Sequence, residues 1–425
     1  MHLFAWNVFL GARESAGPAT PRLLTDMLSQ DNMEKLAAVY FDRIHACYGF
    51  LNRQEMERHI YYRWLSPDMA DGVGDALLCG VAALGHIFSH VDPSTVELDL
   101  VESAKVALEP LLSESPTIKG IMAWLLRAIY LRIAGTPHAA WMASCTVVHM
   151  MEAAGIHRES TGEDVLRTSS GEVEPETRRR LFGVAQHLNT WVSFDVGRSK
   201  VTLPDTDMML ATPRQGDFTI ELIHLLPHSA ILDPTIEIDG TELERTLKTV
   251  LERIHTEPPS VLARCNLALC ICRRLRSLNI SLNGKLLDQV LHVMATGIEA
   301  ARAMIVNGTP WHQMVNVPFQ ILCILLAIDT PASIARLRDV MTCLSDVAAT
   351  WPTNATQETL KTASLLIFMY KKQKERSVAS LEDILASFPV TQQINPNIAR
   401  VDNLTWLDNL VLDDLFNGVL PFENI

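Results

Sequence analysis

The period of the apolar residues most constrains what this 425-residue chain can fold into, because they recur every three or four positions. Residues 119–133 show this period after Pro116, and residues 139–154 show it again up to Gly155. Two such helices joined by a short turn form an antiparallel hairpin. We find no convincing run in which apolar and polar residues alternate as they do in a strand. The pattern therefore predicts an all-α fold.

A third helix is predicted to begin at Pro175, in the first turn, and to end before Gly197. The polar, proline-containing residues 197–217 that follow are expected to form an extended surface loop. Further helices are expected at residues 241–255, 259–278, 285–306, 311–327, 333–350 and 356–376. No repeat of fixed length is apparent, so we expect one large helical domain over residues 1–395.

Charge and hydropathy exclude several classes of partner. The chain has 36 lysines and arginines against 49 aspartates and glutamates, which gives 36 − 49 = −13. Such a chain repels phosphate backbones, so we expect no direct binding of nucleic acid. The longest apolar stretch, residues 317–328, is shorter than the roughly 20 residues of a membrane span, and the first residues do not form a secretory signal. We therefore expect no membrane contact and a cytoplasmic location.

Metal and cofactor motifs are absent from the sequence. The one group of cysteines, Cys265, Cys270 and Cys272, has no second group of ligands at the spacing of a zinc site. His86 and His90 would share a helix face, but no third ligand accompanies them. Phosphate loops, nucleotide fingerprints and the common hydrolase motifs are also missing. We therefore expect no metal and no cofactor.

The end of the chain, residues 396–425, alternates acidic and bulky apolar residues, as in WLDNLVLDDLFNGVL from Trp406. We treat it as a segment separate from the helical body. Such segments can bind coactivators while disordered. A terminal helix docked on the body would have the same composition. Both interpretations stay open at this point.

Two stretches resemble a known family. RRRLFGVAQHLNTWVSFDVGRSKVTLPDTDMM, from Arg178, resembles the signature helix and loop in the middle homology region of fungal binuclear zinc-cluster transcription factors. The arginine triplet, the following leucine, Ser193 and the Gly-Arg pair at Gly197 match in register. PWHQMVNVPFQILCILLAIDTPASI, from Pro310, looks like the conserved helix near the end of that region. With weaker matches at residues 40–56 and 266–275, the resemblance covers most of the chain and implies the family's large helical regulatory domain.

The departures from the family pattern are also informative. The family's Asp-Arg pair is replaced by Asn189 and Thr190, its second aromatic residue by Gly183, and its proline after Gly-Arg by Ser199. The usual ion pair within the helix is therefore not available. These 425 residues also contain no six-cysteine cluster, which is the family's DNA-binding module. The chain is either an excised regulatory domain or a complete protein without a DNA-reading half, and we favour completeness because it starts with Met1.

The Pro310 stretch places polar residues at helical spacing among apolar ones. His312, Asn316 and Gln320 are each four positions apart and share one stripe, next to Trp311. If the stripe faces inward, it can supply hydrogen bonds to a ligand in a cavity. Alternatively, these groups satisfy neighbouring helix ends in a large core.

Three more residues complete the predicted site. Asn266 is a polar residue within an apolar helix, and Trp141 and Trp191 are expected on inner helix faces. An apolar pocket with a few converging polar groups suits an apolar small molecule. Plain core packing is the alternative for both tryptophans.

Two hypotheses about function, an enzyme and a transcriptional regulator, are compatible with these features. Stand-alone relatives of this region include cofactor-free cyclases of the hetero-Diels–Alder type in fungal secondary metabolism, and this resemblance implies an enzyme that joins a quinone methide to a terpene. His312 or Asn316 would donate hydrogen bonds to the developing oxyanion, and Trp141 and Trp191 would hold the hydrocarbon partner. The alternative is a transcriptional regulator, or its ligand-sensing domain, located in the nucleus. We favour the pericyclase, with an apolar molecule as substrate or effector and a homodimer as a compatible assembly.

Overall fold

The computed structural model describes residues 10–11, 13, 22–69, 71–90, 92–159, 174–204, 206–233 and 238–388. Within these ranges every regular element is a helix, and one isolated bridge joins Arg214 to Asp217. The predicted all-α fold is confirmed. The α-helices are α1 (Leu24–Met27), α2 (Gln30–Arg43), α3 (Arg53–Leu65), α4 (Gly72–Ile87), α5 (Thr95–Leu108), α6 (Ile118–Ala134), α7 (Pro137–Ala153), α8 (Pro175–Asp195), α9 (Thr219–Ile223), α10 (Leu226–Ser229), α11 (Gly240–Glu252), α12 (Pro258–Ser277), α13 (Gly284–Val306), α14 (Gln313–Ile328), α15 (Pro331–Thr350) and α16 (Asn354–Ser387).

Side-chain caps explain where many of these helices begin. Among the described residues, seven capping side chains accept a hydrogen bond from the backbone N–H three residues on, namely Ser29, Asn52, Ser94, Thr117, Thr136, Thr330 and Thr353. Helices α7, α8, α12 and α15 also have proline in the first turn, where its missing N–H costs nothing. The starts of α6, α7 and α8 therefore lie within two residues of the predicted positions.

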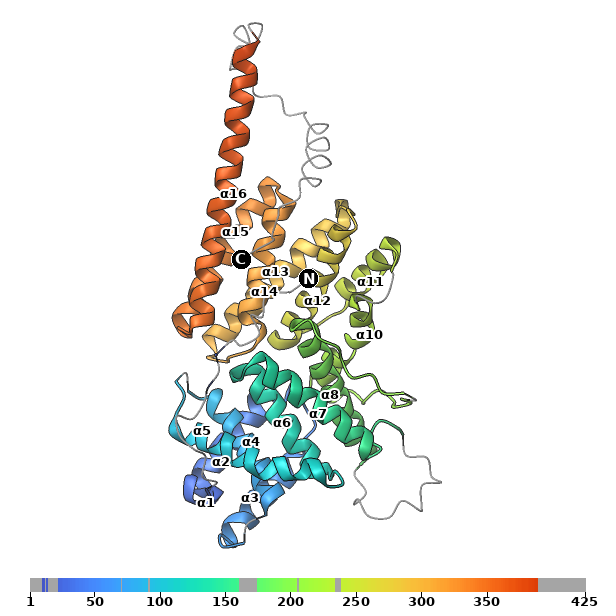
Figure 1. Ribbon diagram of the computed structural model, residues 1–425, viewed down its shortest axis with the longest axis vertical. Helices are drawn as coiled ribbons and strands as arrows, with labels where there is room; N and C mark the ends of the chain where they lie inside the picture. Colours follow the sequence, from blue (N-terminus) through green and yellow to red (C-terminus); the bar gives the residue numbers. More distant parts are fainter. Residues whose placement is uncertain are drawn as a thin grey trace.

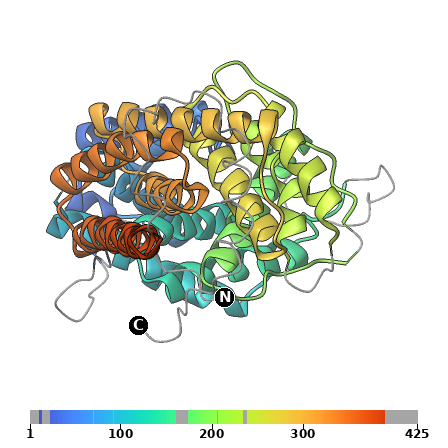
Figure 2. The same cartoon turned by 90° about the horizontal axis from the view of Figure 1, so that it is seen from above.

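The helices form two packed groups (Figure 1). Helices α1–α7 make up the lower part of the molecule and α11–α16 the upper part, and α8 packs against α6 and α7 as well as against α9 and α10. Viewed from above, α16 is seen end-on beside the helices that precede it (Figure 2). One large apolar core runs through both groups, from Leu10 to Ala363, and Ala211, Ile220 and Ile223 form a small separate cluster. Helices α4 and α12 are the most deeply buried, and most of their residues are inaccessible to solvent.

Helix α16 is longer than predicted. Its 34 residues end at Ser387, well past the expected end at residue 376, because the basic run KKQKER consists of good helix formers and does not stop it. The first half packs on α14 and α15, and the second half projects beyond the body of the molecule (Figure 1). The contact is fixed by Asp329, the left-handed residue that ends α14, which accepts hydrogen bonds from Tyr370 and Lys374 of α16.

The acidic and apolar segment 396–425 and the predicted domain end at residue 395 lie outside the described residues. In the part of the chain that the structure describes, no helix combines the length and the hydropathy needed to cross a membrane.

Candidate functional site

The arginine triplet of the signature helix holds segments from both sides of that helix in the chain. Successive residues of a helix point about 100° apart, so Arg178, Arg179 and Arg180 reach in three directions. Arg178 donates to the carbonyl oxygen of Gly155 at 2.8 Å. Arg179 pairs with Glu159 at 2.6 Å, and this pairing lowers the pKa of the Glu159 carboxyl group. The first two arginines thus attach the end of α7 to the start of α8.

Arg180 is the most buried member of the triplet, with 1% of its surface exposed. It pairs with Glu176 at 2.9 Å and with Asp217, and it donates to the carbonyl oxygen of Thr212. His45 lies beside this cluster, and burial lowers its pKa to about 4, against the opposing effect of Asp217. Arg180 therefore attaches the end of the long loop after α8 to the core.

Asn189, which replaces the family's aspartate, attaches the beginning of the same loop. Its amide nitrogen donates to Ser144 Oγ of α7 at 3.1 Å, and its carbonyl oxygen accepts the backbone N–H of Val201 at 2.8 Å. The side chain is almost completely buried, at 1% exposed. A neutral amide therefore replaces the ion pair that the sequence comparison found missing.

Trp141 lies at the outer edge of this contact and is partly exposed. Its indole N–H donates to the carbonyl oxygen of Ser199 at 3.1 Å, and the guanidinium of Arg198 lies over its ring at 4.6 Å. Instead of lying on an inner face, as the sequence suggested, Trp141 holds the loop after α8.

Trp311 and His312 lie deep in the molecule, just before α14. Trp311 is 1% exposed and stacks on Tyr48, with ring centroids 5.4 Å apart. Burial lowers the pKa of His312 well below its usual value, and the nearby Arg132 and His187 lower it further. His312 is therefore a neutral imidazole at neutral pH.

The charged side chain that lowers the pKa of His312 is itself buried. Arg132 of α6 forms an ion pair with Asp195 at the end of α8, and both side chains are less than a tenth exposed. Burial raises the pKa of Asp195, and Arg132 opposes that effect. Burial and Arg132 together lower the pKa of His187 to about 3. The result is a polar cluster inside the interface between the two halves of the molecule.

Three of the predicted polar residues form one hydrogen-bonded group. The amide nitrogen of Gln320 donates to Asn266 Oδ1 of α12 at 2.9 Å and to Asn316 Oδ1 at 2.8 Å. Asn266 is 2% exposed and Gln320 7% exposed. This arrangement pairs polar groups across the α12–α14 contact.

Trp191 is buried on α8 and packs edge-on against Phe194, with centroids 5.7 Å apart. Its indole N–H has no hydrogen-bond partner among the described residues.

The structure thus brings together Asn266, Asn316 and Gln320, and separately Trp311 and His312, whereas Trp141 lies elsewhere. Their role as ligand contacts stays a prediction.

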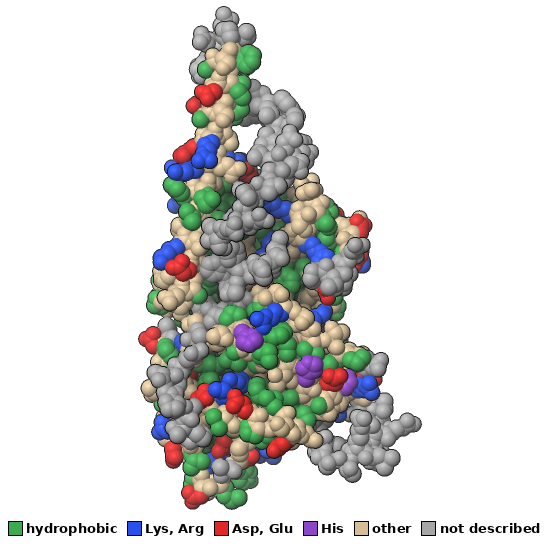
Figure 3. All heavy atoms as spheres, in the orientation of Figure 1, with side chains coloured by type: hydrophobic (Ala, Val, Ile, Leu, Met, Phe, Trp, Pro, Cys, Tyr) green, Lys and Arg blue, Asp and Glu red, His purple; other side chains and the backbone are tan. Residues whose placement is uncertain are grey.

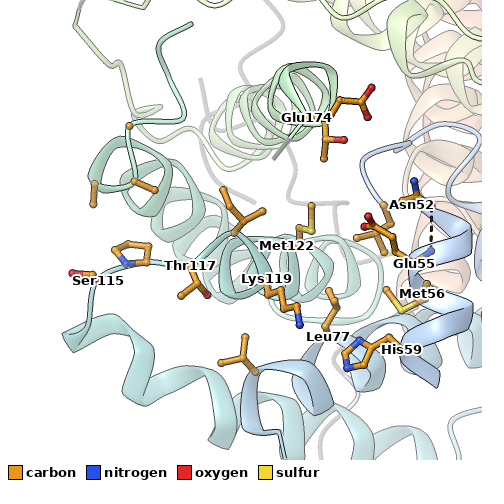
Figure 4. Close-up of a pocket in the computed structure, with 18 of the residues that line it drawn as sticks. Asn52, Glu55, Met56, His59, Leu77, Ser115, Thr117, Lys119, Met122 and Glu174 are labelled. Atoms are coloured by element: carbon orange, nitrogen blue, oxygen red, sulfur yellow. Dashed lines mark hydrogen bonds between the residues drawn. The ribbon is translucent and has the colours of Figure 1, made fainter. Parts of the chain in front are cut away.

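A large open groove lies elsewhere, between α3, α4 and α6 and the adjoining ends of α7 and α8 (Figure 4). Its volume is about 1590 Å³. Apolar side chains of Leu51, Met56, Leu77 and Met122 are among its lining residues. None of the seven predicted site residues lines it.

Four helices begin at this groove, since the lining includes Asn52, Asp71, Thr117 and Glu174, the residues that precede α3, α4, α6 and α8. Helix N-termini carry partial positive charge. Lys119 adds a full charge and, together with burial, lowers the pKa of His59.

The sequence indicated where two of these four helices begin, because Pro116 and Pro175 mark the starts of α6 and α8. It did not show that four helix starts meet in space, because the contacts that join them are between residues far apart in the chain. An apolar base between polar walls can hold a small amphipathic molecule. Among the described residues, no group of three or more histidine, cysteine or acidic side chains is placed to bind a metal.

The signature helix, its clamped loop and the two-part helical body define a class of protein. Residues 37–261 match the family described as the fungal specific transcription factor domain, and the chain belongs to this family.

Several relatives are similar over almost the whole chain. Protein RDR1 of Gibberella zeae is 49% identical over 414 residues, which cover 96% of this chain and 76% of that protein. Transcription factor kojR of Aspergillus oryzae is 35% identical over 97% of this chain and 75% of its own length. Protein RDR1 of Saccharomyces cerevisiae is 32% identical over 90% of this chain and 70% of its own length.

These similarities correct the function favoured from the sequence. The prediction of a cofactor-free cyclase of the hetero-Diels–Alder type is wrong, because the family and its named transcription factor relatives are regulators. The cyclase hypothesis depended on the missing cysteine module, and a missing module is no evidence for chemistry. The catalytic roles of His312 and Asn316 belonged to that hypothesis and are withdrawn with it.

Proposed function

We propose that this chain is the regulatory domain of a fungal transcriptional regulator that acts in the nucleus. The observation that carries the proposal is similarity over 97% of the chain to a protein named as a transcription factor. The buried ion pairs of Arg180 support it, because they give this residue of the family signature a role in holding the domain together.

Deleting the gene and comparing transcripts tests this function directly. We expect a defined set of transcripts to change, and the intact gene to restore them. A gene carrying Arg180→Ala, which breaks the clamp, is expected to restore them poorly. An unchanged transcript profile in the deletion strain would contradict the proposal.

We infer that the groove between α3, α4 and α6 binds a small-molecule effector with an apolar body. Leu51, Met56, Leu77 and Met122 supply apolar surface, and the lining also carries charges of both signs, among them Lys119 and Glu174. The fluorescent anion 1-anilinonaphthalene-8-sulfonate is a suitable probe.

We expect this probe to brighten on binding the full chain and Met122→Glu to weaken its binding about tenfold or more, which corresponds to about 1.4 kcal/mol. Met142→Glu is the matched control, because Met142 is exposed and lies outside the groove. Equal probe binding by both variants would place the apolar site elsewhere.

Direct DNA binding is not expected of these 425 residues, given their net charge of −13. An electrophoretic mobility assay with the purified chain and genomic fragments measures it. A shifted band at physiological salt would show that this expectation is wrong.

A further inference from the structure

Several serine and threonine residues of this chain are followed by proline, which is the minimal motif of proline-directed protein kinases. Such kinases bind the acceptor and its neighbours in an extended conformation. Seven residues precede a proline in this way: Thr20, Ser66, Ser115, Thr136, Thr212, Thr309 and Thr330. Thr20 lies outside the described residues. The structure separates the other six by their exposure and their hydrogen bonds.

Three of the six hydroxyl groups already have a role in the fold. The hydroxyls of Thr136 and Thr330 accept backbone N–H groups at the starts of α7 and α15. Thr309 is 7% exposed, and its hydroxyl accepts a hydrogen bond from Arg43 at 3.0 Å. A phosphate at any of these positions would remove a helix cap or would be buried, so the folded chain does not offer them to a kinase.

Two more of these residues are exposed, but their backbones are held in place. Ser66 lies at the start of a turn after α3, and Arg63 donates to its carbonyl oxygen at 3.3 Å. Thr212 donates its backbone N–H to Glu176 at 2.8 Å, and its carbonyl oxygen accepts a hydrogen bond from Arg180. Neither segment can enter a kinase as an extended strand without losing these bonds.

Ser115 differs from all of these residues. It is exposed, it lies between the 3₁₀ turn Glu109–Ser113 and α6, and it belongs to the lining of the groove (Figure 4). The backbone is extended on both sides of the Ser115–Pro116 pair, with φ and ψ of −114° and 167° at Glu114 and of −98° and 154° at Thr117. Among the described residues, neither the hydroxyl nor the backbone groups of Ser115 have a hydrogen-bond partner. The pair is therefore accessible in the conformation that a kinase binds.

We propose that Ser115 is the phosphate acceptor of a proline-directed protein kinase that uses ATP. In this transfer the Ser115 oxygen forms a bond to the γ-phosphorus of ATP, and the bond from that phosphorus to the oxygen of the β-phosphate breaks. ADP leaves, and a base of the kinase takes the hydroxyl proton. The product is a phosphoserine in the groove lining, two residues before Thr117, which caps α6.

The phosphate changes the charge of the groove. On the face of the molecule in view, acidic and basic side chains are interspersed over the lower part (Figure 3). Each of them has at most one unit of charge, whereas a phosphoserine has about −1.5 to −2 at pH 7. The N-terminus of α6 and Lys119 in its first turn stabilise this charge, and Glu114 opposes them. Any effect of the phosphate on a ligand rests on the effector site proposed above.

Incubation of the folded full chain with magnesium ATP and a purified mitogen-activated protein kinase tests the proposal, with each phosphopeptide read by mass spectrometry. We expect phosphate on Ser115 at a rate about tenfold or more above the rates at Ser66 and Thr212, whose backbone bonds must first break. Ser115→Ala is expected to remove this phosphate, and Pro116→Ala to slow the reaction about tenfold although the hydroxyl remains. Ser66→Ala is the matched control, because it removes an exposed serine–proline pair and should leave the rate at Ser115 unchanged.

Three results would overturn the proposal. Equal rates at Ser115, Ser66 and Thr212 would show that the fold does not select the site. A synthetic peptide of residues 109–122 that is phosphorylated while Ser115 of the folded chain is not would show that the fold hides the residue. A peptide that is no substrate either would show that the sequence does not suit this class of kinase.

Probe binding measures the effect on the groove. The phosphorylated chain is expected to bind 1-anilinonaphthalene-8-sulfonate about twofold to threefold more weakly than the unmodified chain, because the probe and the phosphate are both anions. An unchanged affinity would reject this effect. The phosphate itself is read without ligand or transcription, so its absence and a failure of the proposed function are separate results.

Discussion

At the scale of single residues, the molecule depends on buried polar side chains that are fixed by specific partners. Arg180 and Asp217, Arg132 and Asp195, and the Asn189 amide each join segments that are distant in sequence. Removing one partner from such a pair leaves a buried polar or charged group without compensation, and that loss is more costly than the pair is stabilising.

Arg180→Ala is expected to lower the free energy of unfolding by about 3–5 kcal/mol, because it leaves the carboxylates of Glu176 and Asp217 next to each other without their cation. Urea denaturation followed by circular dichroism measures the change. Arg179→Ala is the control from the same triplet and is expected to cost less, because its pair with Glu159 is more open to solvent. Equal losses for both variants would show that burial of the pair does not decide its contribution.

Asn189→Asp is expected to destabilise the fold by about 1–3 kcal/mol at pH 7, because it buries a carboxylate where an amide donates to Ser144. Burial raises the pKa of the new carboxyl group above its unfolded value, so the penalty is present above the folded pKa. It disappears as the pH falls below the unfolded value near 4. The stability difference from the parent chain should therefore shrink between pH 7 and pH 4.

The double change Asn189→Asp with Thr190→Arg restores the residue pair typical of the family. We expect it to recover part of the lost stability at pH 7, measured in the same denaturation series. If the added arginine brings no recovery, the two positions do not pair in this fold.

The sequence predicted which residues matter better than it predicted what they contact. The triplet at Arg178–Arg180 was recognised as a signature, but its contacts to Gly155, Glu159 and Asp217, which lie 20 to 37 residues away in segments without regular structure, were not predicted. For the stripe of Asn316 and Gln320 the sequence left two interpretations open, and in the structure the Gln320 amide bonds both Asn316 and Asn266. The position of Trp141 could not be predicted, because the loop that covers it has no helical period.

At the scale of the helices, prediction worked where a cap or a proline marks the end of an element. Helix α8 begins at Pro175 as expected, and α6 and α7 differ by one or two residues from the predicted ranges. The end of α16 was missed because no glycine or proline follows residue 376 until Pro389. Where helices approach closely, small residues decide the packing.

Gly85 of α4 illustrates this packing. A Cβ atom there would lie 2.2 Å from the backbone carbonyl oxygen of Leu36 in α2, so Gly85→Ala is expected to push the two helices apart and cost about 1–3 kcal/mol. Gly72→Ala in the first turn of the same helix meets no atom within 4 Å and is expected to stabilise the chain by about 0.5–1 kcal/mol. Urea midpoints of both variants measure the difference, and a neutral Gly85→Ala would disprove the close approach.

At the scale of the whole molecule, the helices share one large apolar core, and few of the cysteine thiols are accessible to solvent. All eight cysteines are free, and only Cys145 and Cys323 are partly exposed. Burial raises the pKa of the thiols, to about 12 for Cys272 and about 11 for Cys323, so little reactive thiolate forms at pH 8. The exposure of the individual thiols could not be ranked from the sequence, because it depends on how the helices pack.

Titration with Ellman's reagent at pH 8 is expected to find at most the two partly exposed thiols in the native chain. In guanidinium chloride all eight should react, which serves as the internal control. Rapid reaction of further thiols without denaturant would show that the core opens.

The arginine triplet has a consequence for how such a chain can vary over generations. Arg178 and Arg179 reach the segment after α7 and Arg180 reaches the end of the loop after α8, so one residue inserted or deleted between Arg180 and Leu181 would turn all three side chains by about 100° and detach both segments at once. Substitutions on the outer face of α8 are tolerated, whereas changes in length are not. We therefore expect homologous sequences to align without gaps in this short stretch, even where their overall identity is low.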